Sequence, residues 1–149
     1  MRCWHKDIVK SLPELQLRSQ WRELVAMAKD LHERGFTNHL LINQIGRYDI
    51  KHFRSYIHIV YKAMIERGVY PTQQSLLKLY EYVGFNPQMS KLEVENVFCD
   101  WHNKEYLRVC LSNLYEKHHF GIGVSRITDE EWETLCRGYK ELTGEEYVI

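Results

Sequence analysis

The sequence predicts an all-α fold, in which residues 1–149 form a compact single-domain helical bundle. Three observations support this prediction. Apolar residues recur at the three- and four-residue spacing of amphipathic helices in several segments. Gly or Pro stands at the ends of these segments, and the connections between them are short. A chain of 149 residues, 44% of them hydrophobic, is also long enough to bury a core without disulfides or metals.

The first helix is expected from about Ser11 to Arg34. The stretch Ser-Leu-Pro-Glu at residues 11–14 is typical of a helix start, with Ser11 as the N-cap and Pro13 in the first turn. Gly35 follows as the expected stop. One apolar stripe should form the core face of this helix, and it consists of Leu17, Trp21, Leu24, Ala28 and Leu31.

Polar side chains flank this stripe on both sides. One side carries the basic residues Arg18, Arg22 and Lys29. The other side carries a polar strip formed by Gln16, Gln20 and Glu23. The adjacent Arg-Glu pair at residues 22–23 is therefore divided between the two flanks of the helix.

A second long helix is expected from Tyr48 to Arg67, with Gly68 as its stop. The segment from Thr37 to Arg47 is interpreted as the connection between the two long helices. A shorter helix should run from Thr72 to Val83 and stop at Gly84.

Two more helices are expected in the C-terminal half, at residues 104–117 and 129–142. The last one begins with a capping box, Thr128 to Glu131. The stretch HHFGIGVSRI at residues 118–127 alternates weakly and is interpreted as a loop or a short strand.

The formal net charge is zero, which argues against a protein that holds nucleic acid by charge alone. The two halves differ, however. Residues 1–70 contain 12 Lys and Arg against 7 Asp and Glu, and residues 71–149 contain 8 against 13. A basic face is therefore expected on the N-terminal half.

Cysteine usage and hydropathy predict a protein of the reducing cytoplasm. The four cysteines contain no C-x-x-C pair, and the N-terminus lacks the apolar core of a signal peptide. No apolar run approaches the ~18 residues that span a bilayer. We therefore expect no membrane association.

The usual signatures of nucleotide-binding enzymes, hydrolases and zinc proteases are missing from the sequence. A metal site is weakly supported, because the only adjacent histidines, His118 and His119, should point to different faces of a helix. No metal and no cofactor are expected.

The N-terminal stretch MRCWHKDIVK contains Cys3, Trp4 and Ile8 and should be tied to the fold as an arm against the first long helix. A fixed N-terminus matters because an α-amine has a pKa near ~8, against ~10.4 for lysine. Such an amine is a ready nucleophile for Schiff-base chemistry. A carboxylate on the following helix could move the protons if the arm folds back on it.

Two stretches carry a resemblance to a known family. The first runs through Leu12, Gln16-Leu17 and Trp21-Arg22-Glu23-Leu24, and the second from Tyr48-Asp49 to Glu66-Arg67-Gly68. Over about residues 1–68 the chain resembles the pyrimidine dimer DNA glycosylases, the phage-type endonuclease V enzymes. The opening MRCWH looks closer to a bacterial branch of that family with uncharacterised members.

The resemblance implies a compact all-α DNA repair enzyme without metal, acting on double-stranded DNA that contains a pyrimidine dimer. In the family an N-terminal α-amine attacks the sugar C1′ and displaces the base, and β-elimination of the resulting imine cuts the strand. The family's proton-moving glutamate matches Glu23. Its phosphate-binding arginine matches Arg22, and its lesion-proximal glutamine is best matched by Gln16.

Position 2 departs from the phage-type pattern, which has a threonine there. Here the residue is Arg2, behind which Met1 is expected to be retained, so the amine would be that of Met1. Further candidate DNA contacts are Arg2, Gln20, Arg18 and Arg47, and Trp4, His5 and Asn43 could line the same site.

Three function hypotheses follow. The first is a glycosylase with associated abasic-site lyase activity, in which Met1 supplies the amine and Glu23 acts as acid and base. The second is a non-catalytic domain on the same fold that binds nucleic acid or a nucleotide. The third is a helical protein-interaction module. A monomer is expected in each case.

Overall fold

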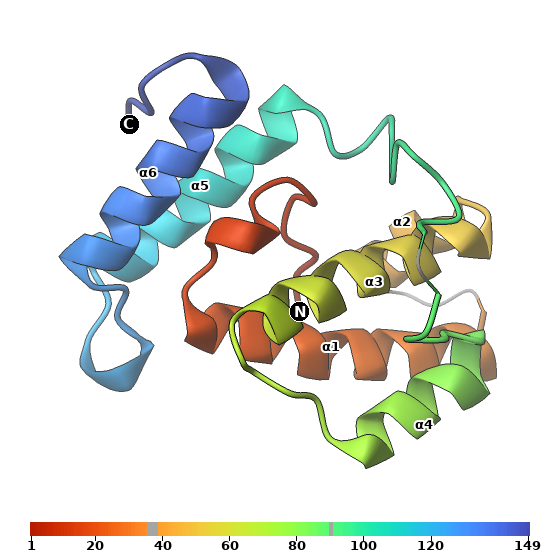
Figure 1. Cartoon of the computed structure of the whole chain (residues 1–149). Helices are drawn as coiled ribbons and strands as arrows, with labels where there is room; N and C mark the ends of the chain where they lie inside the picture. The colour runs from red at the N-terminus through yellow and green to blue at the C-terminus, as the bar shows by residue number, and fades with distance from the viewer. Residues whose placement is uncertain (36–38, 90) are drawn as a thin grey trace.

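The computed structural model describes residues 1–35, 39–89 and 91–149, and over these residues all regular secondary structure is helical (Figure 1). The all-α prediction is confirmed. The elements are η1 (Val9–Ser11), α1 (Glu14–Glu33), α2 (Leu40–Gly46), α3 (Ile50–Glu66), α4 (Gln73–Val83), α5 (Lys104–His119), η2 (Gly123–Ser125) and α6 (Asp129–Thr143).

The start of α1 differs from the prediction. Ser11 is not the N-cap, because its N–H donates to the Ile8 carbonyl at 2.9 Å and the residue closes the short helix η1. The cap position belongs to Pro13, whose carbonyl accepts from the Leu17 N–H at 3.0 Å. The expected stop is confirmed, since Gly35 has a φ of 68° and donates to the last turn of α1.

The connection expected from Thr37 to Arg47 contains a helix that the sequence did not predict. Thr37 and Asn38 lie outside the described residues, but Leu40–Gly46 forms α2 and buries Ile42 and Ile45. Seven residues are too few to display a helical period, which explains why the pattern was missed. The helix expected from Tyr48 begins two residues later, after Asp49 caps it by accepting from the Lys51 N–H.

The remaining helices match their predicted positions closely. Thr72 caps α4 and Gly84 ends it in the left-handed conformation. The capping box of α6 is present, with both reciprocal hydrogen bonds between Thr128 and Glu131. The stretch at residues 118–127 contains the last two residues of α5 and the short helix η2, so it is a loop rather than a strand.

The helices form two groups with the N-terminal arm between them. α1 packs against α2, α3 and α4, and α5 packs against α6. The arm, which we define as residues 1–12, contacts both groups, because η1 touches α3 and α6 (Figure 1). The predicted packing of the arm against the first long helix is confirmed by its hydrogen bonds to α1. No helix in the described ranges has the length and apolarity to cross a membrane.

Candidate functional site

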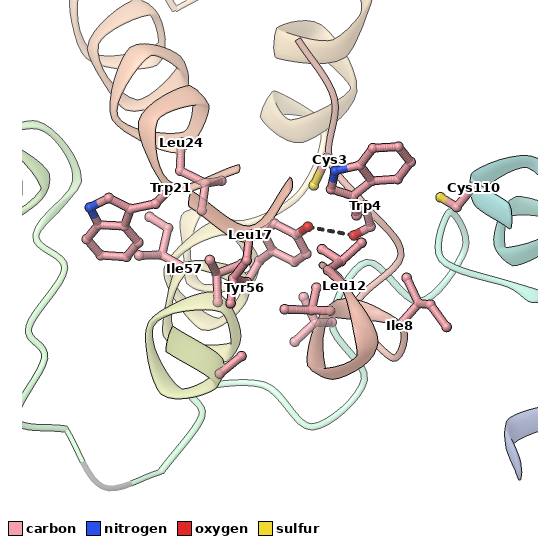
Figure 2. Close-up of a cluster of buried hydrophobic side chains, with 14 of the residues drawn as sticks. Cys3, Trp4, Ile8, Leu12, Leu17, Trp21, Leu24, Tyr56, Ile57 and Cys110 are labelled. Carbon is pink, nitrogen blue, oxygen red and sulfur yellow. Dashed lines mark hydrogen bonds between the residues drawn. The ribbon is translucent and has the colours of Figure 1, made fainter. Parts of the chain in front are cut away.

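Gln20 of α1 fixes the backbone of the arm. Its Oε1 accepts from the Trp4 N–H at 2.8 Å, and its Nε2 donates to the Arg2 carbonyl at 2.7 Å. The hydroxyl of Tyr56 on α3 donates to the Trp4 carbonyl at 2.5 Å (Figure 2). Gln20 and Tyr56 are both fully buried, and burial raises the pKa of the Tyr56 hydroxyl, so it remains a proton donor.

α5 holds the arm from the opposite side. The Tyr106 hydroxyl donates to the Cys3 carbonyl at 2.6 Å, and the Cys110 Sγ accepts from the His5 N–H at 3.4 Å. Burial raises the pKa of the Cys110 thiol to about 11, so this sulfur is a neutral thiol near pH 7. The arm is therefore positioned by side chains from three helices.

Two buried histidines accept the next N–H groups of the arm. The Nδ1 of His102 accepts from the Lys6 N–H at 2.9 Å, and the Nδ1 of His5 accepts from the Asp7 N–H at 3.1 Å. The two rings stack with centroids 5.2 Å apart. Burial lowers the pKa of both, that of His102 to about 2, so His102 is a neutral acceptor at physiological pH.

Glu23 contacts the N-terminal end of the arm. Its Oε2 accepts from the Arg2 N–H at 3.2 Å. The Met1 amine is one residue further along, and one residue spans at most ~3.6 Å, so that amine lies within about 7 Å of the Glu23 carboxylate. The arm does fold back on Glu23 as expected, but the group in direct contact is the Arg2 amide.

A hollow of about 370 Å³ opens beside this contact. Its lining consists of Met1, Arg2, Trp4, Leu15, Gln16, Ser19, Glu23 and Lys117. The guanidinium of Arg2 lies 5.1 Å from the centre of the Trp4 ring, which holds this cation at the wall of the hollow. Arg2 and Lys117 place two cationic side chains around one carboxylate, so the hollow suits an anionic ligand.

Gln16 lines the hollow, but its side-chain oxygen is buried beneath the surface. Its side chain is only 7% exposed, and its Oε1 is buried without a hydrogen-bond partner in the described part of the chain. An unpaired buried carbonyl costs about 1–3 kcal/mol, so such atoms are uncommon in native proteins. A ligand in the hollow would reach this oxygen only if the Gln16 side chain turned toward it.

The other predicted DNA contacts lie outside this hollow. Arg22 donates to the Ser19 Oγ at 3.1 Å, and together with Arg18 it lines a neighbouring hollow of about 470 Å³. Ser19 lines the first hollow, so the two lie side by side on α1. Arg47 is on the surface, where it donates to Gln44 at 3.4 Å, and it lines neither of these hollows.

Several residues of the site gave no signal in the sequence. Tyr56 has the spacing of a packing residue, and its role appears only through the hydrogen bond to Trp4. Lys117 lies in α5, beyond the stretch that carried the resemblance. Within the described ranges, no cluster of three or more His, Cys, Asp or Glu side chains is placed to hold a metal ion.

Comparison with known proteins identifies a family that matches part of the chain. The sequence model of a family described as pyrimidine dimer DNA glycosylase matches residues 1–77. These residues contain the arm, the whole of α1, α2 and α3, and the start of α4. No curated protein and no solved structure matches the chain.

Proposed function

Because the chain belongs to the pyrimidine dimer DNA glycosylase family, we propose that the hollow beside Glu23 is the active site of a glycosylase with associated abasic-site lyase activity. The observation that carries this proposal is the hydrogen bond from the Arg2 N–H to the Glu23 Oε2. This bond holds the first residues of the chain beside a half-buried carboxylate, at the wall of a hollow that also contains Arg2 and Lys117.

The proposed reaction uses the Met1 amine as the nucleophile. Its nitrogen forms a bond to C1′ of the damaged nucleotide while the glycosidic bond breaks, and the base leaves with the electron pair and takes up a proton. Loss of a proton from nitrogen and opening of the sugar ring give an imine. Removal of a C2′ proton then expels the 3′ phosphate oxygen and cuts the strand, and water releases the enzyme from the imine.

Glu23 is proposed to move the protons of this sequence. Among the described residues that line the hollow, it is the only carboxylate. Its contact with the Arg2 amide fixes one carboxylate oxygen, and the other remains available for proton transfer. Fixing a reacting group within a few tenths of an ångström matters, because a misplacement of about 1 Å can cost a hundredfold in rate.

We propose that the DNA is held by cations on both sides of Glu23. Arg2 and Lys117 would bind phosphates at the hollow, and Arg22 and Arg18 would continue this contact along α1. Gln16 would donate or accept a hydrogen bond near the lesion, and Arg47 would contact phosphate further away. Gln20 already uses both ends of its amide on the arm, so we assign it a positioning role.

Reductive trapping tests this proposal. The purified protein is first weighed by mass spectrometry to establish its N-terminal residue, and it is then incubated with abasic duplex DNA and sodium borohydride. A covalent adduct is expected, and selective acylation of the α-amine should abolish it. Salt-dependent binding of the duplex without an adduct would overturn the proposed lyase chemistry and support the non-catalytic nucleic-acid-binding alternative.

We further propose that the protein acts as a monomer in a reducing compartment. Its four cysteines are free thiols. Cys3 is buried within the arm and Cys110 beside it, where oxidation would disturb the positioning of the N-terminus. Sedimentation of the reduced protein should give a mass near 18.0 kDa.

A further inference from the structure

The connection between α5 and α6 exposes three apolar side chains at alternating positions. Phe120, Ile122 and Val124 are 72%, 84% and 95% exposed. Figure 1 shows this connection projecting from the α5–α6 pair. Large apolar side chains gathered on one exposed segment are typical of an interaction site. We refer to residues 120–124 as the apolar loop.

The backbone gives the apolar loop a fixed shape. At Gly121 a Cβ atom would lie only 2.1 Å from the Lys117 carbonyl oxygen, so the loop turns tightly against the end of α5. Gly123 has a φ of 68°, a conformation that favours glycine. The same Lys117 carbonyl accepts from the N–H of Ile127, which is buried. The loop is thus closed at its base, and its apolar side chains point to solvent.

The apolar loop begins at the candidate active site. Lys117 lines the hollow that contains Glu23, and Phe120 follows only three residues later. Two cations, Lys117 and Arg126, stand at the base of the loop, next to the exposed carboxylates of Glu116, Asp129 and Glu130. Asp129 offsets part of this charge through ion pairs with Arg126 at 3.8 Å and His118 at 2.8 Å.

We propose that the apolar loop is a wedge that enters the damaged duplex beside the lesion. Phe120 and Val124 would insert into a base step and unstack it, while Lys117 and Arg126 contact the flanking phosphates. Apolar wedges of this kind kink a duplex and open its base steps. The inference rests on the proposed function, because an unstacked lesion would bring its C1′ to the hollow.

Duplex DNA is the occupant that the observations favour. The wedge is apolar at its tip, as insertion into a stacked base step requires, and Lys117 and Arg126 at its base supply cations for the flanking phosphates. Lys117 belongs both to the base of the loop and to the lining of the hollow, so one duplex would contact both. A membrane surface or a second copy of the chain would not explain why the loop starts at the hollow.

Base unstacking can be measured on a duplex that the protein is not expected to cleave. The probe is a duplex with a tetrahydrofuran abasic analogue and 2-aminopurine in the opposite strand, whose fluorescence rises when the base unstacks. Wild-type protein should raise this fluorescence. For the double variant Phe120→Ala, Val124→Ala, the ratio of the affinity for this duplex to the affinity for undamaged duplex should be about tenfold lower than for wild type. The matched control is Leu40→Ala on α2, where an equally exposed leucine is removed; it should behave as wild type.

A second readout separates this inference from the proposed function. Single-stranded abasic DNA needs no unstacking from a partner strand, so the double variant should form as much borohydride adduct on it as wild type does, and about tenfold less on abasic duplex. Equal fluorescence for the wild type and the double variant would overturn the wedge, whatever the trapping result. Loss of vesicle binding or of self-association in the double variant, with both DNA readouts unchanged, would overturn it as well. A loop-dependent signal without any adduct would support the wedge and reject the lyase.

Discussion

The backbone N–H of Arg2 donates to the Oε2 of Glu23 at 3.2 Å, across 21 positions of the chain. This bond places the start of the chain beside a carboxylate that faces the hollow. It also makes a clean substitution possible, because a glutamine at position 23 would keep an oxygen that accepts from the same N–H.

Glu23→Gln should preserve the fold and remove the proposed proton transfer. General acid–base groups contribute about 10²–10⁴-fold to a rate, so base release from dimer-containing duplex should fall by that order. Glu33→Gln, an exposed carboxylate at the end of the same helix, serves as the control and should leave the rate unchanged. The measurement is single-turnover release of the damaged base. A rate within twofold of wild type for Glu23→Gln would exclude this carboxylate from catalysis.

Gln20→Met should destabilise the protein although the two side chains have similar volume. Methionine leaves the buried Trp4 N–H without its acceptor and the Arg2 carbonyl without its donor. With about 1–3 kcal/mol for a buried group left unsatisfied, a loss of roughly 2–4 kcal/mol in the free energy of unfolding is expected. Urea denaturation measures this loss, and the exposed Gln73→Met on α4 is the control. If both variants lose the same small amount, Gln20 does not hold the arm.

The stability of the protein should fall on mild acidification. The pKa of His102 is lowered by burial to about 2, so below the unfolded-state value of about 6.5 the unfolded chain binds a proton that the folded protein does not. The stabilisation is complete above pH 6.5 and is lost as the pH decreases, at up to about 1.4 kcal/mol per pH unit for this residue. The lowered pKa of His5 adds to the effect in the same direction.

His102→Asn tests the origin of this pH dependence. The asparagine Oδ1 can replace the Nδ1 of His102 as the acceptor for the Lys6 N–H, but it does not titrate. Urea unfolding at pH 7.5, 6.5, 5.5 and 4.5 should therefore give a flatter profile for the variant than for wild type. Parallel profiles would assign the pH dependence to other groups, such as His58, whose pKa is also lowered by burial.

Much of the fold and part of the site could be predicted because they depend on local spacing. The helical period identified the core face of α1, and the structure buries Trp21 and Leu24 accordingly. The same spacing placed Gln20 and Glu23 on one strip, which in the structure faces the arm. The burial of Gln20 was not evident, because a polar strip looks solvated until the segment that covers it is known.

The rest of the site depends on contacts between distant segments. Tyr56 reaches the Trp4 carbonyl across 52 positions, and Tyr106 reaches the Cys3 carbonyl across 103. No local pattern states which tyrosine hydroxyl will meet which carbonyl, since tyrosine commonly serves as a packing residue. The prediction of Ser11 as the cap of α1 was wrong because residues 9–11 form the separate turn η1, and α1 begins only at Glu14.

Gly121→Ala should disturb the apolar loop through its backbone. The new Cβ would lie 2.1 Å from the Lys117 carbonyl oxygen, a backbone atom that cannot move without shifting the end of α5. A cost of about 1–3 kcal/mol is expected. At Gly68 a Cβ meets nothing within 4 Å, and Gly68→Ala should cost only the ~1 kcal/mol of its left-handed backbone. Thermal unfolding of the two variants compares these effects, and an unchanged midpoint for Gly121→Ala would show that the loop accommodates a side chain.

Phosphate binding by Lys117 and Arg22 should appear in the salt dependence of DNA affinity. Each neutralised phosphate adds about 0.9 to the slope of log affinity against log salt, so Lys117→Gln and Arg22→Gln should each lower that slope by about 1. Lys62→Gln is the control, since this lysine lines a different hollow together with Lys10 and Glu66. Fluorescence anisotropy with an undamaged duplex between 50 and 200 mM salt measures the slope, so lesion chemistry plays no part. Lys117→Gln could leave the slope unchanged while Arg22→Gln lowers it. The duplex would then follow the outer flank of α1 without crossing the hollow, and this result would contradict the placement of the active site in the hollow.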